Sequence, residues 1–261
     1  MIEYLILAQL KAAQQMHFQV QTTPLVSAES ALVYDLNTDN FIYKKNIHQK
    51  LSIASLTKLI TAYIIISEHD LQEIVTVPSL ASTVAGSSMG LRSQDQLTIH
   101  QLLQGLLINS GNDAALTLAL HNGGDLQTFV SKMNLYAKML GLQHSSFQNP
   151  MGFDHPKNFS TAADLLKLSR KITQFPIITQ IANTKQKQIK SLKGRIYKLR
   201  NTNQELHNYL AIQGLKTGKT DAAQECFIGL NKEQKLSIVL NSQNRFLDTK
   251  NLLDWSQKIN Y

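Results

Sequence analysis

The order in which two hydrophobic periodicities follow one another is the feature that most constrains the fold of this chain. Strand-like runs occur at residues 31–36 ("ALVYDL") and 41–46 ("FIYKKN"), and the "NTDN" between them suits a tight reversal. From Ser55 to about Thr173 the apolar residues recur every three or four positions, which is typical of helices. After Pro176 the strand-like runs return. Strands on both sides of a helical middle predict one sheet assembled from both ends of the chain, with the helical cluster inserted.

The individual segments define this prediction. Four segments show helical periodicity: "TIHQLLQGLLI", "NDAALTLAL", "DLQTFVSKMNLYAKML" and "TAADLLKLSRKI". The later strand-like runs are "QIKSLKGRIYKL", which turns at Gly194, "YLAIQGLKTG", "CFIGLN" and "KLSIVLN". The last segment, "NRFLDTKNLLDWSQKI", is helical again. We expect an α/β (α+β) fold, with an antiparallel sheet flanked by helices. One domain is predicted over residues 24–261, with sheet parts at about 24–50 and 183–261 and a helical part at about 51–182. Residues 1–23 are expected to form an N-terminal extension, either a short helix or a trimmed leader.

Composition limits the remaining possibilities. The chain has 261 residues, of which 43% are hydrophobic, so it can bury a substantial core. No stretch approaches the roughly 18 to 20 apolar residues of a membrane span, and no transmembrane segment is predicted. The N-terminal run has Glu3 where a secretory signal has basic residues, so no export signal is evident. The single cysteine, Cys226, excludes an internal disulfide.

The net charge of +8 favours anionic surroundings such as nucleic acid, acidic lipid or a polyanionic wall. Much of the excess lies in residues 184–200, which hold seven basic side chains and no acidic one. Tyr197 is the one aromatic residue of this segment, so the segment lacks the stacking platform of a single-strand binder. We therefore interpret it as a solvated basic hairpin, and predict no nucleic-acid partner.

The segment "SIASLTKLITAYIII" places Ser55 and Lys58 three residues apart where a buried helix begins. One interpretation is structural: a serine caps the helix while the lysine extends to water. The other is chemical, because residues i and i+3 share a helix face and an amine beside a hydroxyl can activate it. A helix start also offers unpaired NH groups to a developing oxyanion. The pattern alone leaves both interpretations open.

Two further short motifs allow the same pair of interpretations. In "INSGNDAA", Ser110 and Asn112 lie between two helical segments, where they either project into a cleft or cap the next helix. In "GLKTGKT", Lys216, Thr217 and Gly218 end a strand-like run. That run is either a simple strand boundary or an edge that binds an extended peptide and its terminal carboxylate.

Together, SxxK, SxN and KTG occur in order, and each falls where its chemistry requires it: a helix start, a helix junction and a strand. The chain therefore resembles the penicillin-binding D-alanyl-D-alanine carboxypeptidases. The resemblance covers roughly residues 24–261 and includes "SIASLTKLITA", "LLQGLLINSGNDAALTLA", "FQNPMGFDHPKNFSTAADL" and "GLKTGKTDAA". It implies a β-lactamase/transpeptidase-like fold, without the C-terminal β-domain and amphipathic helix of many relatives. The sequence departs from the family at Gln94 and Asp95, where Pro-Gly is usual, and at Gln224, where Gly is usual.

The resemblance implies catalytic roles for three residues. Ser55 would attack the carbonyl between two terminal D-alanines, form an acyl-enzyme and release the last alanine. Lys58 would accept the proton, which requires its pKa to fall by roughly three units, equivalent to about 4 kcal/mol. Burial and the charge of Lys216 would supply that shift. Ser110 would relay a proton to the leaving amine.

The resemblance also implies a set of binding residues. Asn112 would hold the substrate amide, while Lys216 and Thr217 would bind the terminal carboxylate. Gly218 would permit close approach of the peptide. The backbone NH of Lys219, with that of the nucleophile, would form the oxyanion hole.

Further expectations concern cofactors, partners and place. The eight histidines show no HExxH motif and no short paired spacing, so we predict no metal and no cofactor. The expected partners are a peptidoglycan stem peptide ending in D-Ala-D-Ala and β-lactam antibiotics. The resemblance implies an extracytoplasmic location in the bacterial cell envelope, secreted or periplasmic.

Several alternatives remain open. A class A β-lactamase needs a Glu-positioned water, yet "NPMGFDHPKNFSTAADL" contains no Glu, and of its acids Asp164 is explained by a T-x-x-D helix start at Thr161. Asp154 is the other acid available. A serine glutaminase of the same superfamily, a penicillin receptor without turnover, a wall-binding module and a basic nucleic-acid binder are the other candidates.

Overall fold

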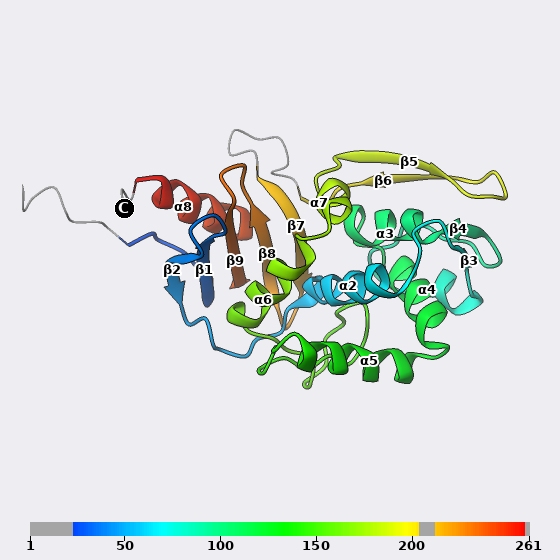
Figure 1. Ribbon diagram of the computed structural model, residues 1–261, viewed down its shortest axis with the longest axis horizontal. Coiled ribbons are helices and arrows are strands. Elements are labelled where there is room, and N and C mark those ends of the chain that lie inside the picture. Colours follow the sequence, from blue (N-terminus) through cyan, green and yellow to red (C-terminus); the bar gives the residue numbers. More distant parts are fainter. Residues whose placement is uncertain (1–22, 204–211, 259–261) are drawn as a thin grey trace, which may run out of the picture.

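The computed structural model describes residues 23–203 and 212–258. The predicted N-terminal extension, apart from its last residue, lies outside the described residues, as does the beginning of the predicted strand "YLAIQGLKTG". A five-stranded antiparallel sheet has the order β2-β1-β9-β8-β7. Its strands are β1 (Ser30–Asp35), β2 (Asn40–Lys45), β7 (Gln213–Thr220), β8 (Gln224–Leu230) and β9 (Lys235–Ser242). The predicted sheet built from both ends of the chain is thus confirmed (Figure 1).

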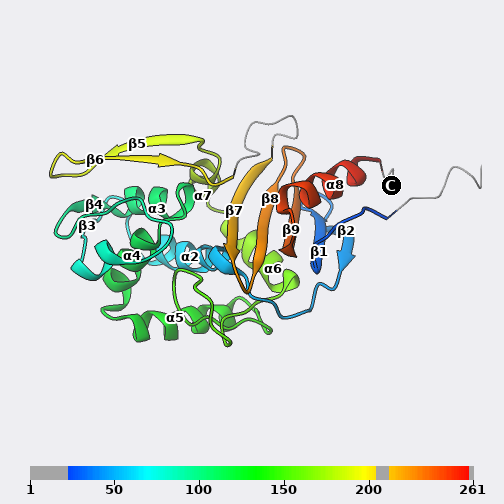
Figure 2. The same ribbon diagram turned by 180° about the vertical axis from the view of Figure 1, so that it is seen from behind.

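Helices cover both faces of this sheet. Alternate residues of a strand point to opposite faces, and in β1 Ala31 and Val33 belong to a cluster with Leu252 of α8 (Arg245–Lys258). Leu32, between them, packs with the helical core on the other face. Figures 1 and 2 show α8 on one side of the sheet and α6 (Ala162–Ile172) on the other.

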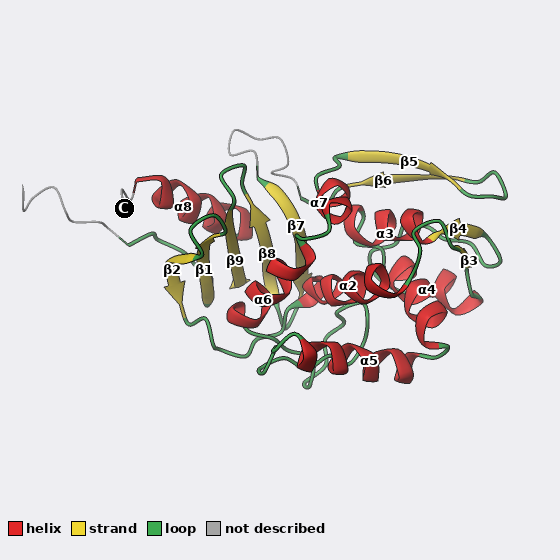
Figure 3. Ribbon diagram, viewed as in Figure 1, coloured by secondary structure: helices red, strands yellow, loops and turns green. Residues whose placement is uncertain are grey.

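The helical part surrounds α2, as Figure 3 shows. It comprises η1 (Ala54–Thr57), α2 (Lys58–Glu68), η2 (Ser79–Thr83), α3 (Ile99–Ile108), α4 (Asn112–Gly123), α5 (Leu126–Met139), α6 and α7 (Pro176–Ala182). Because α2 contacts α3, α4, α5 and α6, its sequence is apolar nearly all round. A short strand pair, β3 (Ile74–Thr76) with β4 (Gln96–Thr98), also lies in this region, where only helices were expected.

The predicted C-terminal sheet part is wrong at its beginning. The hairpin of β5 (Gln186–Lys190) and β6 (Ile196–Arg200) forms a separate two-stranded sheet that lies over α3, and the main sheet resumes only at β7 (Figures 1 and 2). The hairpin buries Ile189, Tyr197 and Leu199 against the helical core, so its apolar residues are satisfied without the main sheet. All seven basic side chains of residues 184–200 are exposed, as expected of a solvated basic hairpin.

The departures from the family pattern affect the backbone. Gln94 has φ +63° and Gln224 has φ +49°, so both adopt the left-handed region that costs a side-chain-bearing residue about 1 kcal/mol or more. Asp95 does not adopt it; its buried carboxylate instead accepts a 2.6 Å hydrogen bond from the hydroxyl of Tyr197. The turn therefore anchors the basic hairpin.

Among the described residues, none of the helices has the length and apolarity needed to cross a bilayer.

Candidate active site

Ser55 and Lys58 are joined by a local turn. Ser55 lies in the 3-10 turn η1, and α2 begins at Lys58, so the serine precedes the α-helix instead of starting it. In a 3-10 turn residues i and i+3 eclipse one another. Nζ of Lys58 accordingly lies 2.8 Å from Oγ of Ser55.

The backbone before Ser55 is held by a close contact. Gly152, with φ +89°, approaches so near that a Cβ there would lie 1.9 Å from the carbonyl oxygen of Ala54. Glycine is therefore required at this position. The loop that contains Gly152 also carries Met151, whose carbonyl faces the amine of Lys58.

Lys58 is fully buried, so the interpretation in which it extends to water is wrong. Its Nζ donates to Oδ1 of Asn112 at 2.7 Å and to the carbonyl of Met151 at 2.6 Å. Burial, followed by the positive charge of Lys216, holds the pKa of Lys58 well below its usual value, against an opposing effect of Asp113. A neutral amine has two N–H groups and one lone pair. Both N–H groups donate to oxygens that can only accept, Oδ1 of Asn112 and the carbonyl of Met151, so the lone pair of Lys58 is left for the hydroxyl of Ser55.

The SxN motif forms the junction between α3 and α4. Ser110 is buried and has φ +56°, a strained conformation for a residue other than glycine. Asn112 is the first residue of α4 and makes no capping hydrogen bond, so the capping interpretation is wrong. Its Nδ2 donates to the carbonyl of Ala85 at 2.7 Å while its Oδ1 accepts from Lys58.

The KTG motif lies on β7, the edge strand of the sheet. Lys216 is only 3% exposed, and its Nζ donates to Oγ of Ser110 at 2.8 Å and to the carbonyl of Thr217 at 2.8 Å. Burial and the nearby charge of Arg245 lower the pKa of Lys216 to about 7. The hydroxyl of Thr217 lies 2.6 Å from that of Thr202.

β7 runs directly beside the nucleophile. A Cβ on Gly218 would lie 3.0 Å from the backbone nitrogen of Ser55, so a side chain at this position would press on η1. Lys219 follows on the same strand, and its exposed side chain pairs with Glu225 at 3.1 Å. The three motifs, far apart in sequence, therefore meet in one place through Lys58–Asn112, Lys216–Ser110 and Gly218–Ser55.

Three further residues support the site and were not predicted as site residues. Met151 acts through a backbone carbonyl, which no side-chain pattern reveals. Arg245, in the first turn of α8, donates to the carbonyl of Gly218 at 2.8 Å and so ties β7 to α8. Asp113 accepts from the hydroxyl of Ser88 and from three successive backbone NH groups, those of residues 89–91, which fixes the loop before β4.

The fold brings together two histidines that have no short paired spacing in the sequence. His69 and His121, distant in sequence, both contact Glu73 at the opposite end of α2 from Lys58. The i,i+4 spacing of His69 and Glu73 was the available signal, but His121 comes from a different helix.

Comparisons with known proteins agree with this arrangement. The family model for D-alanyl-D-alanine carboxypeptidase, peptidase family S11, matches residues 17–244. The carboxypeptidase DacF of Bacillus subtilis is 30% identical over 217 residues, 81% of this chain and 56% of the relative. DacC of Escherichia coli is 32% identical over 257 residues, 91% of this chain and 63% of the relative. The chain thus spans 56% and 63% of the length of these two curated relatives.

Solved structures show the same fold. The Streptomyces K15 DD-transpeptidase superposes with a TM-score of 0.85 at 28% identity, covering 91% of this chain and 100% of that one. Penicillin binding protein 6B from Escherichia coli superposes with a TM-score of 0.81 at 30% identity, covering 91% of this chain and 79% of that one. The β-lactamase/transpeptidase-like fold expected from the resemblance is confirmed.

Proposed function

The chain belongs to the D-alanyl-D-alanine carboxypeptidase family, and we propose that it is a serine DD-carboxypeptidase. Its reaction removes the terminal D-alanine from peptidoglycan stem peptides ending in D-Ala-D-Ala. The observation that carries this proposal is the position of Nζ of Lys58, 2.8 Å from Oγ of Ser55 with its two other contacts on oxygen acceptors.

Acylation begins at this pair. The depressed pKa of Lys58, caused by burial and by Lys216, favours the neutral amine that accepts the hydroxyl proton of Ser55. Oγ of Ser55 then bonds to the carbonyl carbon of the penultimate D-alanine. The C–N bond breaks, and the leaving amine receives a proton. Water then hydrolyses the ester: the ammonium of Lys58 returns its proton to Oγ of Ser55, and the carboxylic acid that forms releases its proton to solvent.

The proton for the leaving amine travels through Ser110. Its hydroxyl lies 2.8 Å from Nζ of Lys216, and Lys216, with a pKa of about 7, exchanges protons readily near neutral pH. A substrate carboxylate bound to Lys216 and Thr217 favours the protonated lysine by opposite-charge attraction. The contact between the substrate carboxylate and Lys216 therefore both binds the substrate and keeps Lys216 protonated for proton transfer through Ser110.

The oxyanion hole comprises the backbone NH groups of Ser55 and Lys219. The close approach of Gly218 to the backbone nitrogen of Ser55 supports this assignment, because it brings the two segments side by side. Loss of one donor of this kind typically lowers turnover by about 10² to 10³-fold. Asn112, held by Lys58 and Ala85, is oriented to bind the substrate amide.

The proposal also covers the domain organisation of the chain, its location and its reaction with β-lactams. Residues 24–261 act as one catalytic domain, and the substrate implies an extracytoplasmic location in the cell envelope. β-Lactams, which resemble the acyl donor, acylate Ser55. Slow release is expected because residues 149–165 contain no Glu and both of their acids are engaged: Asp164 accepts from the NH of His144 and the hydroxyl of Ser145, and Asp154 accepts from the hydroxyl of Thr220 and the NH of Ala222.

The test combines labelled penicillin with a peptide ending in D-Ala-D-Ala. The wild type is expected to keep the label and release D-alanine, and Ser55→Ala is expected to do neither. Ser131→Ala, an exposed serine of α5, is the matched control and retains both activities. Label without product indicates a penicillin receptor, rapid loss of label indicates a β-lactamase, and absence of label in the wild type contradicts the proposal.

A further inference from the structure

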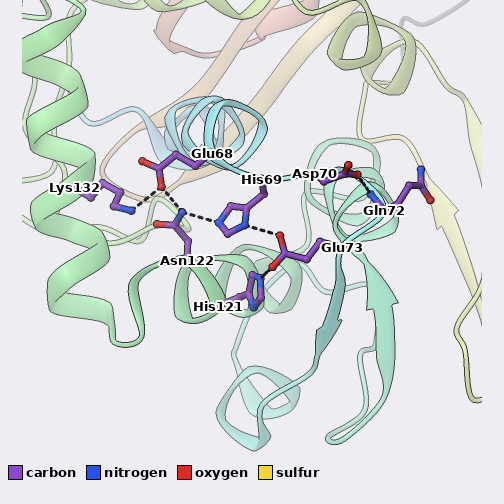
Figure 4. A network of polar contacts seen from close by, with 8 residues as sticks. All are labelled: Glu68, His69, Asp70, Gln72, Glu73, His121, Asn122 and Lys132. Atoms are coloured by element: carbon purple, nitrogen blue, oxygen red, sulfur yellow. Dashed lines mark hydrogen bonds and ion pairs between the residues drawn. The ribbon is translucent and has the colours of Figure 1, made fainter.

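A second group of ionisable side chains lies where α2 ends. Nδ1 of His69 lies 2.8 Å from Oε2 of Glu73, and Nε2 of His121 lies 2.7 Å from Oε1 of the same carboxylate. The candidate ligand atoms all lie within 4.8 Å of one another. Figure 4 shows both rings turned toward the carboxylate between them. We call these three residues the His-Glu cluster.

The donor set of this cluster suits a borderline divalent metal. Two imidazole nitrogens and one carboxylate form a recurrent zinc ligand set that leaves a fourth position for water. The side chains of His69, His121 and Glu73 are 17%, 26% and 38% exposed, so an ion can enter directly from solvent. We propose that His69, Glu73 and His121 bind one Zn²⁺ ion, at a site separate from the proposed active site.

The local field also favours a cation. His69 is the C-cap of α2, and His121 lies in the last turn of α4, so the negative ends of two helix dipoles converge here. The carboxylate of Glu73 lies between the two rings, with one oxygen toward each, so it is already placed as the acidic member of the site. Glu68, whose carboxylate is shared among Lys132, Tyr136 and Asn122, lies beside the cluster, but its charge is balanced by the ammonium of Lys132 at 2.7 Å.

The geometry requires only a small adjustment. Bonds of about 2.0 to 2.1 Å in a tetrahedral zinc site place neighbouring ligand atoms about 3.4 Å apart. The present separations between Glu73 and the two rings are 2.8 and 2.7 Å. Zinc would therefore replace two hydrogen bonds, and each ring would move away from the Glu73 carboxylate by about 0.6 to 0.7 Å. Partly exposed side chains accommodate such a change by small rotations.

The protons of His69 can also be accounted for. Nδ2 of Asn122 lies 2.9 Å from Nε2 of His69 and donates to it, so the ring carries its proton on Nδ1 while the site is hydrogen-bonded. Zinc on Nδ1 moves the proton to Nε2. The Oδ1 atom of Asn122 is buried and has no hydrogen-bond partner among the described residues. For this oxygen to accept from Nε2 the amide must turn, and the hydrogen bond from Nδ2 of Asn122 to Glu68 is then lost; Glu68 retains Lys132 and Tyr136.

The location gives the site a structural consequence. The helices α2 and α4 begin at Lys58 and Asn112, whose side chains are hydrogen-bonded, and their opposite ends carry His69 and His121. A bound zinc ion would link those two ends, so that both helices are tied together at each end. The proposal does not depend on the peptidase activity.

The test is calorimetric titration of the chelator-treated 261-residue chain with zinc chloride. We expect one saturable zinc ion per chain and a higher melting temperature with zinc. His121→Gln and the nearly isosteric Glu73→Gln are each expected to weaken zinc binding about 100-fold or more. Loss of a residue that only supports a metal ligand typically lowers metal affinity about 10 to 100-fold, so loss of a ligand itself should cost at least as much. His48→Gln removes an exposed histidine elsewhere and is expected to bind like the wild type.

Cobalt provides an independent readout, because four-coordinate Co²⁺ has intense visible absorption that the cluster variants lack. Circular dichroism establishes that each variant is folded. No saturable zinc uptake by the wild type would overturn the proposal, leaving a hydrogen-bonded cluster without metal. Binding that persists undiminished in folded His121→Gln or Glu73→Gln would overturn it equally, since the ion would then be held by other residues.

Discussion

Nζ of Lys58 lies 2.7 Å from Oδ1 of Asn112, which joins the first residue of α2 to the first residue of α4. Both side chains are buried, and the contact occupies one N–H of an amine whose pKa is strongly lowered. The same bond therefore fixes the relative position of two helices and directs the lysine lone pair toward Ser55.

Replacement of Lys58 tests whether the amine acts as a base. In Lys58→Met the apolar stem remains and the base is lost, so the acylation rate with labelled penicillin is expected to fall about 10² to 10⁴-fold. Lys58→Arg is expected not to restore it, because guanidinium cannot lose its proton in this pH range. Stopped-flow acylation measures the effect. A rate within threefold of the wild type for folded Lys58→Met would contradict the assignment.

The buried Lys216 predicts that stability rises with pH. Its pKa is lowered to about 7 in the folded chain, from the ordinary lysine value of 10.5, so between these values the unfolded chain binds more protons. From pH 7 to pH 9 this difference stabilises the fold by about 2 kcal/mol. Urea unfolding at both pH values should show the gain in the wild type and a smaller one in Lys216→Met, which lacks the contribution of Lys216. An equal gain in both proteins would argue against the buried, deprotonating Lys216.

Arg245 is expected to act as a positioning residue through Lys216. Its charge is one cause of the lowered pKa of Lys216, so Arg245→Gln should raise that pKa and move the alkaline limb of the kcat/KM profile to higher pH. Loss of its bond to the carbonyl of Gly218 should also raise KM. Arg195→Gln, in the exposed hairpin, is the control. If the alkaline limb of the kcat/KM profile does not shift, Arg245 does not act through the pKa of Lys216 and serves only to hold β7 in place.

Asp113 is predicted to be important for stability. Its carboxylate is buried and accepts hydrogen bonds from Ser88 and from the backbone of residues 89–91. In Asp113→Asn an amide NH₂ would face some of these donors, and we expect a loss of about 2 to 3 kcal/mol in the free energy of unfolding. Urea denaturation measures this, with exposed Asp70→Asn as the control. A loss below about 0.5 kcal/mol would show that the loop is held by other contacts.

The sequence predicted much of the fold because local periodicity reports which face of each element is buried. The T-x-x-D pattern at Thr161 indicated a helix start, and the Thr161 side chain does accept from the backbone NH of Asp164 at 3.1 Å. The hairpin of β5 and β6 shows the limit of this reasoning. Its alternation predicted strands, but alternation does not say which surface the apolar face of Tyr197 will cover, and that surface is α3 and its neighbours.

The sequence by itself determined which residue types were available and in which local setting: a serine one turn before a lysine, a polar junction between helices, and a lysine on an edge strand. Only the tertiary structure decided that Lys58 is buried, that Lys216 reaches Ser110, and that His69 and His121 share Glu73. The physical reason is that hydrophobic periodicity is a local property. Desolvation and the distances between charges depend on segments that meet only when the sheet closes around the helical core.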